Sequence, residues 1–291
     1  MDRADRDVAR SLAGMSVARA YALDGPGRSR TRTRRSAALA VHRVLADPAL
    51  LTPVFQPIVN LVSGDTVGFE ALARLATDPH RAPIELFRDA RDAGLGPEVE
   101  ALAVRRALET AASAGLPPDT FVSVNISPLV LGHRAIWDVF RPRDLDQVVI
   151  ELTEDDAVDD YGALRRDMRR YLDRGVRFAI DDAGAGFASM RHLAELWPTF
   201  FKLDALLTRG LRRDTRRQAM VRALATLAID VDAMLIVEGV EHTDDLLHLA
   251  QARLPILVQG YAVSRPKAPW PVVSRVARRA IAASAERRTL V

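Results

Sequence analysis

The stretch that decides the fold is Val176-Arg177-Phe178-Ala179-Ile180-Asp181-Asp182, in which a mostly apolar run ends abruptly in two carboxylates. Similar short apolar runs, several of them rich in β-branched residues, recur between positions 67 and 259 and also end in a polar side chain. Runs of this kind are typical of buried parallel strands. The polar residues that end them are Glu70, Asn125, Glu151, Asp181, Asp182, Lys202, Glu238 and Gln259.

These runs alternate with segments whose pattern is typical of helices. The strand candidates are residues 54–58, 67–69, 121–124, 148–150, 176–180, 200–201, 234–237 and 257–258. The helix candidates are residues 84–93, 98–114, 160–174, 189–196, 215–228, 244–252 and 272–283. The alternation indicates one α/β domain with a largely parallel sheet, and about eight strands favour a (β/α)₈ TIM-like barrel over an open sheet. The chain also lacks the glycine-rich phosphate-binding loop of open dinucleotide-binding sheets.

In a closed barrel the ends of the strands meet at one mouth, which is the face where barrel enzymes hold their active sites. Several carboxylates brought together there cannot all stay ionised without cations. Oxygen donors suit Mg²⁺, Mn²⁺ or Ca²⁺ better than Zn²⁺, and the chain has no cysteine to supply a thiolate. The sequence therefore predicts a metal site at the mouth, of the kind in which paired ions about 3.5–4 Å apart hydrolyse phosphate esters.

Composition limits the remaining classes. A chain of 291 residues with 48% hydrophobic composition can bury one large core or two modest ones. No apolar stretch approaches the ~20 residues of a membrane span and residues 1–10 are too charged for a signal peptide. We therefore expect a cytoplasmic protein without a membrane span.

The arginine-rich start of the chain stands apart from the alternating pattern. Arginine occupies nearly every other position from 28 to 35, which is typical of a flexible extension. A contact of this arm with DNA, anionic lipid or a partner protein is the alternative, although the net charge of +3 supports it only weakly. We expect a basic extension at residues 1–40, one catalytic domain at residues 41–285 and a tail at residues 286–291.

Eight short blocks carry a family resemblance. They are Phe55-Gln56-Pro57-Ile58, Glu70-Ala71-Leu72 followed by Arg74, Val124-Asn125-Ile126-Ser127-Pro128, Glu151-Leu152-Thr153-Glu154, Asp181-Asp182, Lys202-Leu203-Asp204, Glu238-Gly239-Val240-Glu241 and Gln259-Gly260-Tyr261. In these blocks the chain resembles the EAL domain, the bacterial family that hydrolyses cyclic di-GMP. The resemblance runs from about residue 53 to residue 266, and the blocks follow the family order at similar spacings.

The resemblance implies a barrel with one antiparallel strand, here the first, near residues 54–58. It implies one Mg²⁺ or Mn²⁺ ion held by Glu70, Asn125, Glu151 and Asp181, and a second held by Asp181, Asp182 and Glu238. The catalytic set it implies is Lys202, Glu70, Gln259 and Glu238, with Lys202 and Gln259 orienting the attacking water. A depressed pKa would let Lys202 accept or shuttle a proton.

The resemblance also implies how the substrate and the neighbouring loop are held. Gln56 and Arg74 would contact cyclic di-GMP, and Arg74 suits a phosphate oxygen. Glu154 would anchor the loop after the paired aspartates, although a carboxylate at a helix start is an equally good interpretation of it. A homodimer is the assembly that the family implies.

The loop after the paired aspartates departs from the family. It reads Asp181-Asp182-Ala183-Gly184-Ala185-Gly186-Phe187-Ala188-Ser189 instead of the usual Asp-Asp-Phe-Gly-Thr-Gly-Tyr-Ser-Ser. The substitutions remove an aromatic ring and three hydroxyls, although the metal-binding positions are unchanged. Because the family uses this loop to couple dimerisation, metal occupancy and turnover, such changes would lower activity. The segment from Arg74 to Pro83 is also shorter than usual, and one extra residue separates Glu238 from Gln259.

Three functions follow from these observations. The first is a metal-dependent phosphodiesterase that converts cyclic di-GMP to linear 5′-pGpG. The second, motivated by the altered loop, is a receptor that binds the dinucleotide with little turnover. The third is an interaction protein that binds neither metal nor nucleotide and uses the basic arm.

Overall fold

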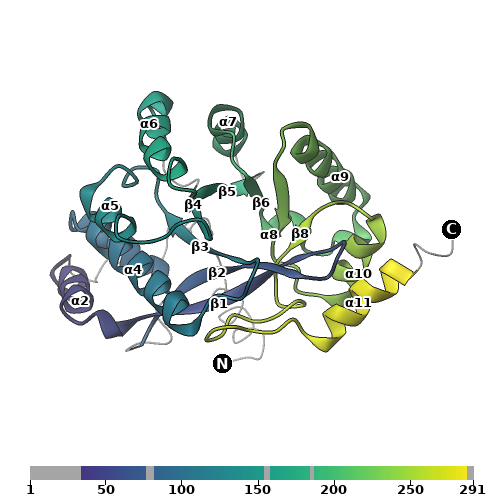
Figure 1. Ribbon diagram of the computed structural model, residues 1–291, viewed down its shortest axis with the longest axis horizontal. Coiled ribbons are helices and arrows are strands. Elements are labelled where there is room, and N and C mark those ends of the chain that lie inside the picture. The colour runs from purple at the N-terminus through teal and green to yellow at the C-terminus, as the bar shows by residue number, and fades with distance from the viewer. Residues whose placement is uncertain (1–33, 77–81, 154–157, 184–186, 287–291) are drawn as a thin grey trace.

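Eight strands close into a barrel in the order of the sequence (Figure 1) within the described part of the chain. The computed structural model describes residues 34–76, 82–153, 158–183 and 187–286. The strands are β1 (Leu51–Asn60), β2 (Thr66–Leu75), β3 (Phe121–Ile126), β4 (Val148–Leu152), β5 (Arg177–Ala183), β6 (Phe200–Leu203), β7 (Met234–Val237) and β8 (Leu257–Val258). β1 is antiparallel to both β2 and β8, and every other pair of neighbours is parallel. The predicted barrel with an antiparallel first strand is confirmed.

Helices surround this barrel (Figure 1). They are α2 (Arg34–Ala46), α3 (Pro83–Asp92), α4 (Gly96–Ala114), α5 (Arg134–Phe140), α6 (Tyr161–Leu172), α7 (Phe187–Leu196), α8 (Ala205–Thr208), α9 (Thr215–Asp230), α10 (Thr243–Ala252) and α11 (Arg275–Glu286), with 3-10 turns η2 (Pro48–Leu50) and η3 (Leu211–Arg213). The sequence analysis did not predict α2, α5 or α8. Within the described residues, no helix is both long and apolar enough to cross a membrane.

Helix α2 packs outside the barrel. Its buried Val41 and Val44 join a separate apolar cluster with residues of α3 and α4, including Leu86 and Phe87. The boundary predicted at residue 40 therefore falls inside α2. The rest of the predicted arm, residues 1–33, and residues 287–291 of the predicted tail lie outside the described part of the chain.

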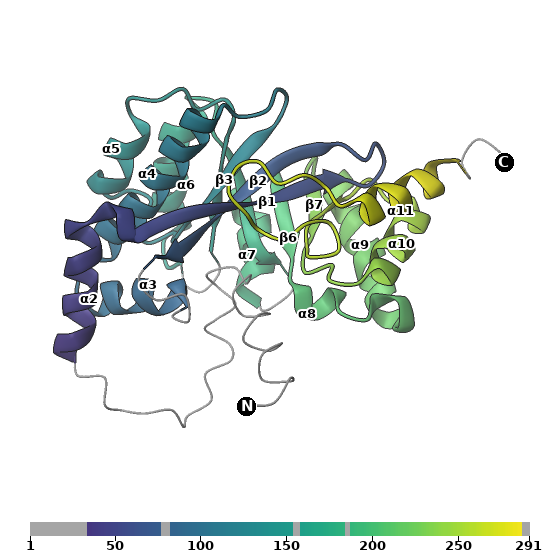
Figure 2. The ribbon, with the colours of Figure 1, turned by 90° about the horizontal axis from the view of Figure 1, so that it is seen from below.

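The segment after β8 closes the side of the barrel where β1 lies. It crosses the outside of β1 (Figure 2), where Phe55 donates its amide to the Lys267 carbonyl at 2.7 Å and receives the Lys267 amide at 3.0 Å. Trp270 contacts the rings of Phe55 and Phe69 at centroid distances of 4.7 and 4.8 Å. Its indole donates to the Gly115 carbonyl at 2.8 Å, so this segment joins β1, β2 and the end of α4.

An apolar floor fills the inside of the barrel. One buried cluster takes one residue from each of seven strands, namely Ile58, Phe121, Val149, Ala179, Phe200, Ile236 and Leu257. In β2 the corresponding position is Gly68, where a β-carbon would lie only 2.5 Å from the Phe121 ring. Because alternate residues of a strand point to the same face, the residue two places beyond each floor position also faces the interior. The floor thus determines which side chains meet above it.

Candidate active site

A ring of polar residues lies directly above the apolar floor. It has eight buried members, each two residues from a floor position: Gln56, Glu70, Ser123, Glu151, Asp181, Lys202, Glu238 and Gln259. Six lie on strands, and Glu238 and Gln259 directly follow β7 and β8. We call this set the polar ring. Asn125 also lies on β3, two residues after Ser123. The structure therefore brings together predicted site residues that are far apart in the sequence.

Two details of the polar ring differ from the expectation. Glu70 lies in the middle of β2 rather than at its end, because β2 continues to Leu75 in antiparallel register with β1. Ser123 was not predicted, although it is fully buried and pairs in register with Glu70. Its hydroxyl has no hydrogen-bond partner among the described residues. The signal that could have found Ser123 is the two-residue period, since it precedes Asn125 by two positions.

Lys202 lies at the centre of the polar ring. Its Nζ is 2.6 Å from Glu151 Oε2, 2.6 Å from Glu238 Oε1, 3.2 Å from Asp181 Oδ1 and 3.6 Å from Glu70 Oε1. The lysine side chain is fully buried, and so are those of Glu151 and Asp181. One ammonium group therefore balances part of the charge of four carboxylates.

Amide side chains hold the carboxylate of Glu70. Asn125 Nδ2 donates to Glu70 Oε1 at 3.0 Å, and Gln259 Nε2 lies 2.6 Å from Glu70 Oε2. Gln259 Nε2 also lies 3.2 Å from Gln56 Oε1, while Gln56 Nε2 donates to the Ser264 carbonyl at 3.0 Å. A continuous set of contacts thus runs from the segment after β8 to Asn125.

The pKa values in the polar ring reflect burial and crowding. Burial raises the pKa of Glu151 to about 8, with Glu70 and Asp181 adding to the effect and Lys202 opposing it. Burial likewise raises the pKa of Glu238 well above its usual value, against the opposing charge of Lys202. Burial alone would lower the pKa of Lys202, but the surrounding carboxylates outweigh it and hold this pKa well above its ordinary value. The depressed pKa that a proton-accepting Lys202 requires is therefore not found.

The chemistry of the ring suits a hard divalent cation. Buried Asn125 Oδ1, Glu151 Oε1 and Gln259 Oε1 have no hydrogen-bond partner among the described residues. Carboxylate and amide oxygens are the donors that Mg²⁺ and Mn²⁺ prefer. No three His, Cys, Asp or Glu side chains in the described ranges already form an ion cage. Instead the Lys202 ammonium takes the central position, so a metal at this place requires Lys202 to move aside.

A cavity opens beside this ring, between β2, β3, α3 and α4. Arg74, Arg91 and Arg106 line it together with apolar side chains, and Asn125 and Ser127 border it on the side of the site. Burial lowers the pKa of Arg74, and Tyr261 and Glu70 act in the opposite direction. Arg74 Nη1 donates to the Ala73 carbonyl at 2.7 Å. Arginine side chains in a cavity next to the site provide charge for an anionic group.

The profile of the EAL domain family matches residues 45–266 of the chain. The chain belongs to the EAL domain family. An uncharacterised signalling protein of Caulobacter vibrioides is 32% identical to this EAL domain over 247 residues, which cover 81% of the chain and 30% of the relative. RocR, named as a cyclic di-GMP phosphodiesterase of Pseudomonas aeruginosa, is 28% identical over 73% of the chain and 56% of RocR.

A solved structure resembles this EAL domain closely in fold. The standalone EAL protein of Vibrio cholerae O395, in its form bound to cyclic di-GMP, matches with a TM-score of 0.67 and 25% identity. The match covers 77% of this chain and 95% of the Vibrio protein. The chain spans about a third of the length of several curated relatives that it matches.

Some expected site residues of this EAL domain lie outside the part of the chain that the structure describes. Asp182 belongs to β5, but its side chain is not described, and neither is Glu154. Residues 184–186 of the altered loop are also outside the described ranges. The second-ion ligand expected from Asp182 and the loop anchor expected from Glu154 therefore stay predictions.

Proposed function

We propose that this EAL domain hydrolyses cyclic di-GMP to linear 5′-pGpG with two Mg²⁺ or Mn²⁺ ions, which would lower the level of this second messenger. The observation that carries the proposal is the polar ring, where four carboxylates lie within 3.6 Å of the Lys202 Nζ atom. Glu151 Oε1 and Gln259 Oε1 in the ring, and Asn125 Oδ1 beside it, are buried without a hydrogen-bond partner among the described residues. A structural core would not gather four carboxylates around one ammonium group, because each buried charge costs free energy unless it has a partner.

The proposed ion ligands are side chains of the polar ring and its neighbours. Glu70, Asn125, Glu151 and Asp181 would hold one ion, while Asp181, Asp182 and Glu238 would hold the second. Such ions, when bound, lower the pKa of a bound water and neutralise charge on the phosphate. The chain's own part is to hold these oxygens in place on rigid strands and to exclude other cations by its donor set.

The role proposed for Lys202 follows from its charge. In the arrangement without metal, the surrounding carboxylates outweigh burial and raise the pKa of Lys202, so Lys202 is proposed to act as a cation next to the nucleophile. It would turn from the centre of the ring towards the attacking water, with Gln259 orienting that water by its amide. A retained positive charge next to the nucleophile favours the deprotonated water.

Substrate binding is assigned to Gln56 and Arg74. Gln56 lies in the polar ring, where its Oε1 is 3.2 Å from Gln259 Nε2, and this contact supports a role next to the proposed water-orienting amide. Arg74 lines the cavity next to Asn125, where its guanidinium can reach a phosphate oxygen of a bound dinucleotide. We place the reaction in the cytoplasm and propose that the domain acts as a homodimer.

A receptor with little turnover is the second candidate. Two observations favour it: the loss of hydroxyls in the loop 181–189, and the position of Lys202 where an ion would bind. A receptor would bind cyclic di-GMP without producing 5′-pGpG.

Chromatography of cyclic di-GMP incubated with the purified protein and Mg²⁺ or Mn²⁺ tests the proposal. We expect 5′-pGpG to appear, and we expect Glu70→Ala to abolish it while circular dichroism shows an intact fold. Unchanged nucleotide together with measurable binding would establish the receptor instead. Unchanged nucleotide without binding would contradict both candidates and favour an interaction protein.

A further inference from the structure

Helix α8 connects the two strands that carry Lys202 and Glu238. It begins at Ala205, three residues after Lys202. Asp204 is its N-cap and accepts the Leu206 amide at 2.6 Å. The end of β7 is tied to the same place, because the Glu238 amide donates to the Leu203 carbonyl at 3.1 Å. The helix is therefore fixed at its start beside both side chains.

Thr208 reaches from the end of α8 to the backbone of Glu238. This threonine is 1% exposed, and its hydroxyl lies 2.5 Å from the Glu238 carbonyl and 3.1 Å from the Ala205 carbonyl. A hydroxyl has one proton to donate, and the shorter contact to Glu238 takes it. A buried donor that holds the carbonyl of a proposed ion ligand restricts where the carboxylate of that residue can lie.

The next residue brings the two backbones into direct contact. Gly239 has φ +59°, and a β-carbon there would lie 1.9 Å from Ala205 Cβ. Only glycine adopts this conformation at low cost and permits this approach. The turn after Glu238 thus packs directly against α8 through Gly239 and Ala205. The Thr208 hydroxyl is the hydrogen-bond donor between this helix and the Glu238 backbone.

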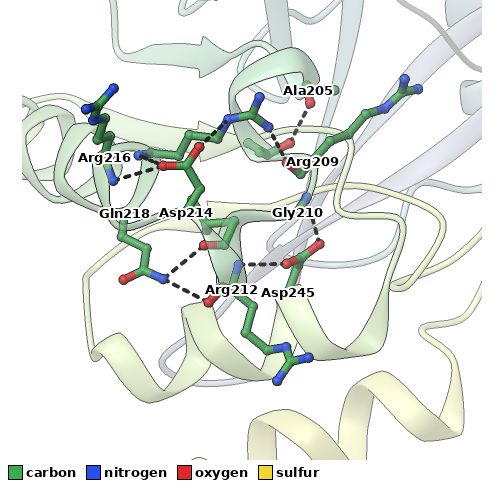
Figure 3. A network of polar contacts seen from close by, with 11 residues as sticks. Ala205, Arg209, Gly210, Arg212, Asp214, Arg216, Gln218 and Asp245 are labelled. Atoms are coloured by element: carbon green, nitrogen blue, oxygen red, sulfur yellow. Dashed lines mark hydrogen bonds and ion pairs between the residues drawn. The ribbon is translucent and has the colours of Figure 1, made fainter.

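The segment after α8 is held from the far side by Asp245 of α10. Asp245 is buried and accepts the Arg212 amide at 2.9 Å and the Gly210 amide at 3.3 Å (Figure 3). Gln218 donates to the Leu211 and Arg212 carbonyls at 2.9 and 3.1 Å in the same view (Figure 3). These contacts fix the segment that directly follows Thr208 to α10 and α9.

Lys202 and Glu238 are therefore connected in two ways. Their side chains are in contact, with Glu238 Oε1 2.6 Å from Lys202 Nζ. The chain from Lys202 also continues to Thr208, whose hydroxyl donates to the Glu238 carbonyl. We propose that Thr208 is a positioning residue, which sets the Glu238 carboxylate against Lys202 and the second ion. This inference rests on the proposed function, since Glu238 is assigned there as an ion ligand.

Thr208→Val tests the inference, because valine keeps the shape of threonine and removes only the hydroxyl. Thr226→Val is the matched control, since the Thr226 hydroxyl also donates to a carbonyl, that of Arg222 at 3.1 Å, but on an exposed part of α9. Thr208→Ser restores the donor, and Asp245→Asn removes one of the acceptors that hold the segment. Mn²⁺ affinity is measured calorimetrically, and kcat and KM are measured with cyclic di-GMP.

We expect Thr208→Val to weaken Mn²⁺ binding and to lower kcat by roughly 10- to 100-fold, the range for loss of an outer partner of a metal ligand. KM should change little, because Glu238 is proposed as an ion ligand and Gln56 and Arg74 as the substrate contacts. Thr208→Ser should stay close to the wild type, and Asp245→Asn should fall between the two. Thermal denaturation confirms that each variant is folded.

Equal Mn²⁺ affinity and kcat in Thr208→Val and Thr226→Val would overturn the inference. An equal loss in Thr208→Ser would also overturn it, because the hydroxyl would then not be the cause. If the wild type binds Mn²⁺ without hydrolysing cyclic di-GMP, the proposed function fails, while the Mn²⁺ affinities of the variants still decide on Thr208.

Discussion

Replacing Lys202 by methionine is the most direct test of how the polar ring is held together without metal. Lys202→Met keeps most of the side-chain volume and removes the one charge that contacts four carboxylates at 2.6–3.6 Å. Loss of one partner from a buried ion pair destabilises a protein by about 3–5 kcal/mol. Lys202 contacts four carboxylates, but the loss of stability should stay within this range for a single pair. The reason is that Glu151 and Glu238, whose pKa values are already raised, can take up protons when the ammonium is removed.

The corresponding change in thermal stability is large enough to measure. At about 2–4 °C per kcal/mol for a domain of this size, Lys202→Met should lower Tm by about 6–20 °C in the presence of a chelator. Mn²⁺ should then stabilise the variant more than the wild type, since no ammonium competes for the oxygens. An ion present at 100 times its Kd raises the free energy of unfolding by about 2.7 kcal/mol.

The assay is differential scanning fluorimetry of wild type, Lys202→Met and Lys267→Met, each with chelator and with Mn²⁺. Lys267 is the chain's other lysine and is exposed, so the same substitution there controls for the chemical change. An unchanged Tm for Lys202→Met in chelator would refute the reasoning, because the ring would then not depend on this cation. Equal Mn²⁺ stabilisation of all three proteins would refute the competition between lysine and metal.

Three further predictions concern the backbone, the ion and the loop. Gly260→Ala should destabilise the fold by at least about 1 kcal/mol in urea denaturation. The reason is that Gly260 has φ +153° and a β-carbon would lie 2.3 Å from the Val240 carbonyl oxygen. An unchanged urea midpoint would contradict this prediction. Ca²⁺ should inhibit hydrolysis and excess Mg²⁺ should reverse it, since longer Ca²⁺–oxygen bonds misplace the water; hydrolysis in Ca²⁺ at the Mg²⁺ rate would speak against the proposed ions. Ala183→Phe combined with Ala185→Thr should raise kcat if the altered loop limits turnover, and an unchanged kcat would mean that the loop differences are neutral.

Much of the fold and the site was predictable because both follow from local patterns. Apolar runs such as 148–150 and 234–237 identify strands by composition alone, and their alternation with helices leaves few topologies. Helices with strong periodicity, such as α4 and α6, were expected close to their observed bounds. Short helices such as α5 and α8 were missed, because one or two turns leave too little periodicity to recognise.

The sequence by itself determined the barrel and most members of the polar ring, because strand ends and the two-residue period are properties of the chain. Tertiary structure decided the rest. The sequence placed Lys202 at the same mouth as the carboxylates, but it did not indicate that the Lys202 ammonium would contact four of them at 2.6–3.6 Å. It also did not indicate that Thr208 would hold the Glu238 carbonyl from α8. These contacts join residues on different elements, and their distances depend on register, strand tilt and side-chain rotamers that only the closed barrel defines.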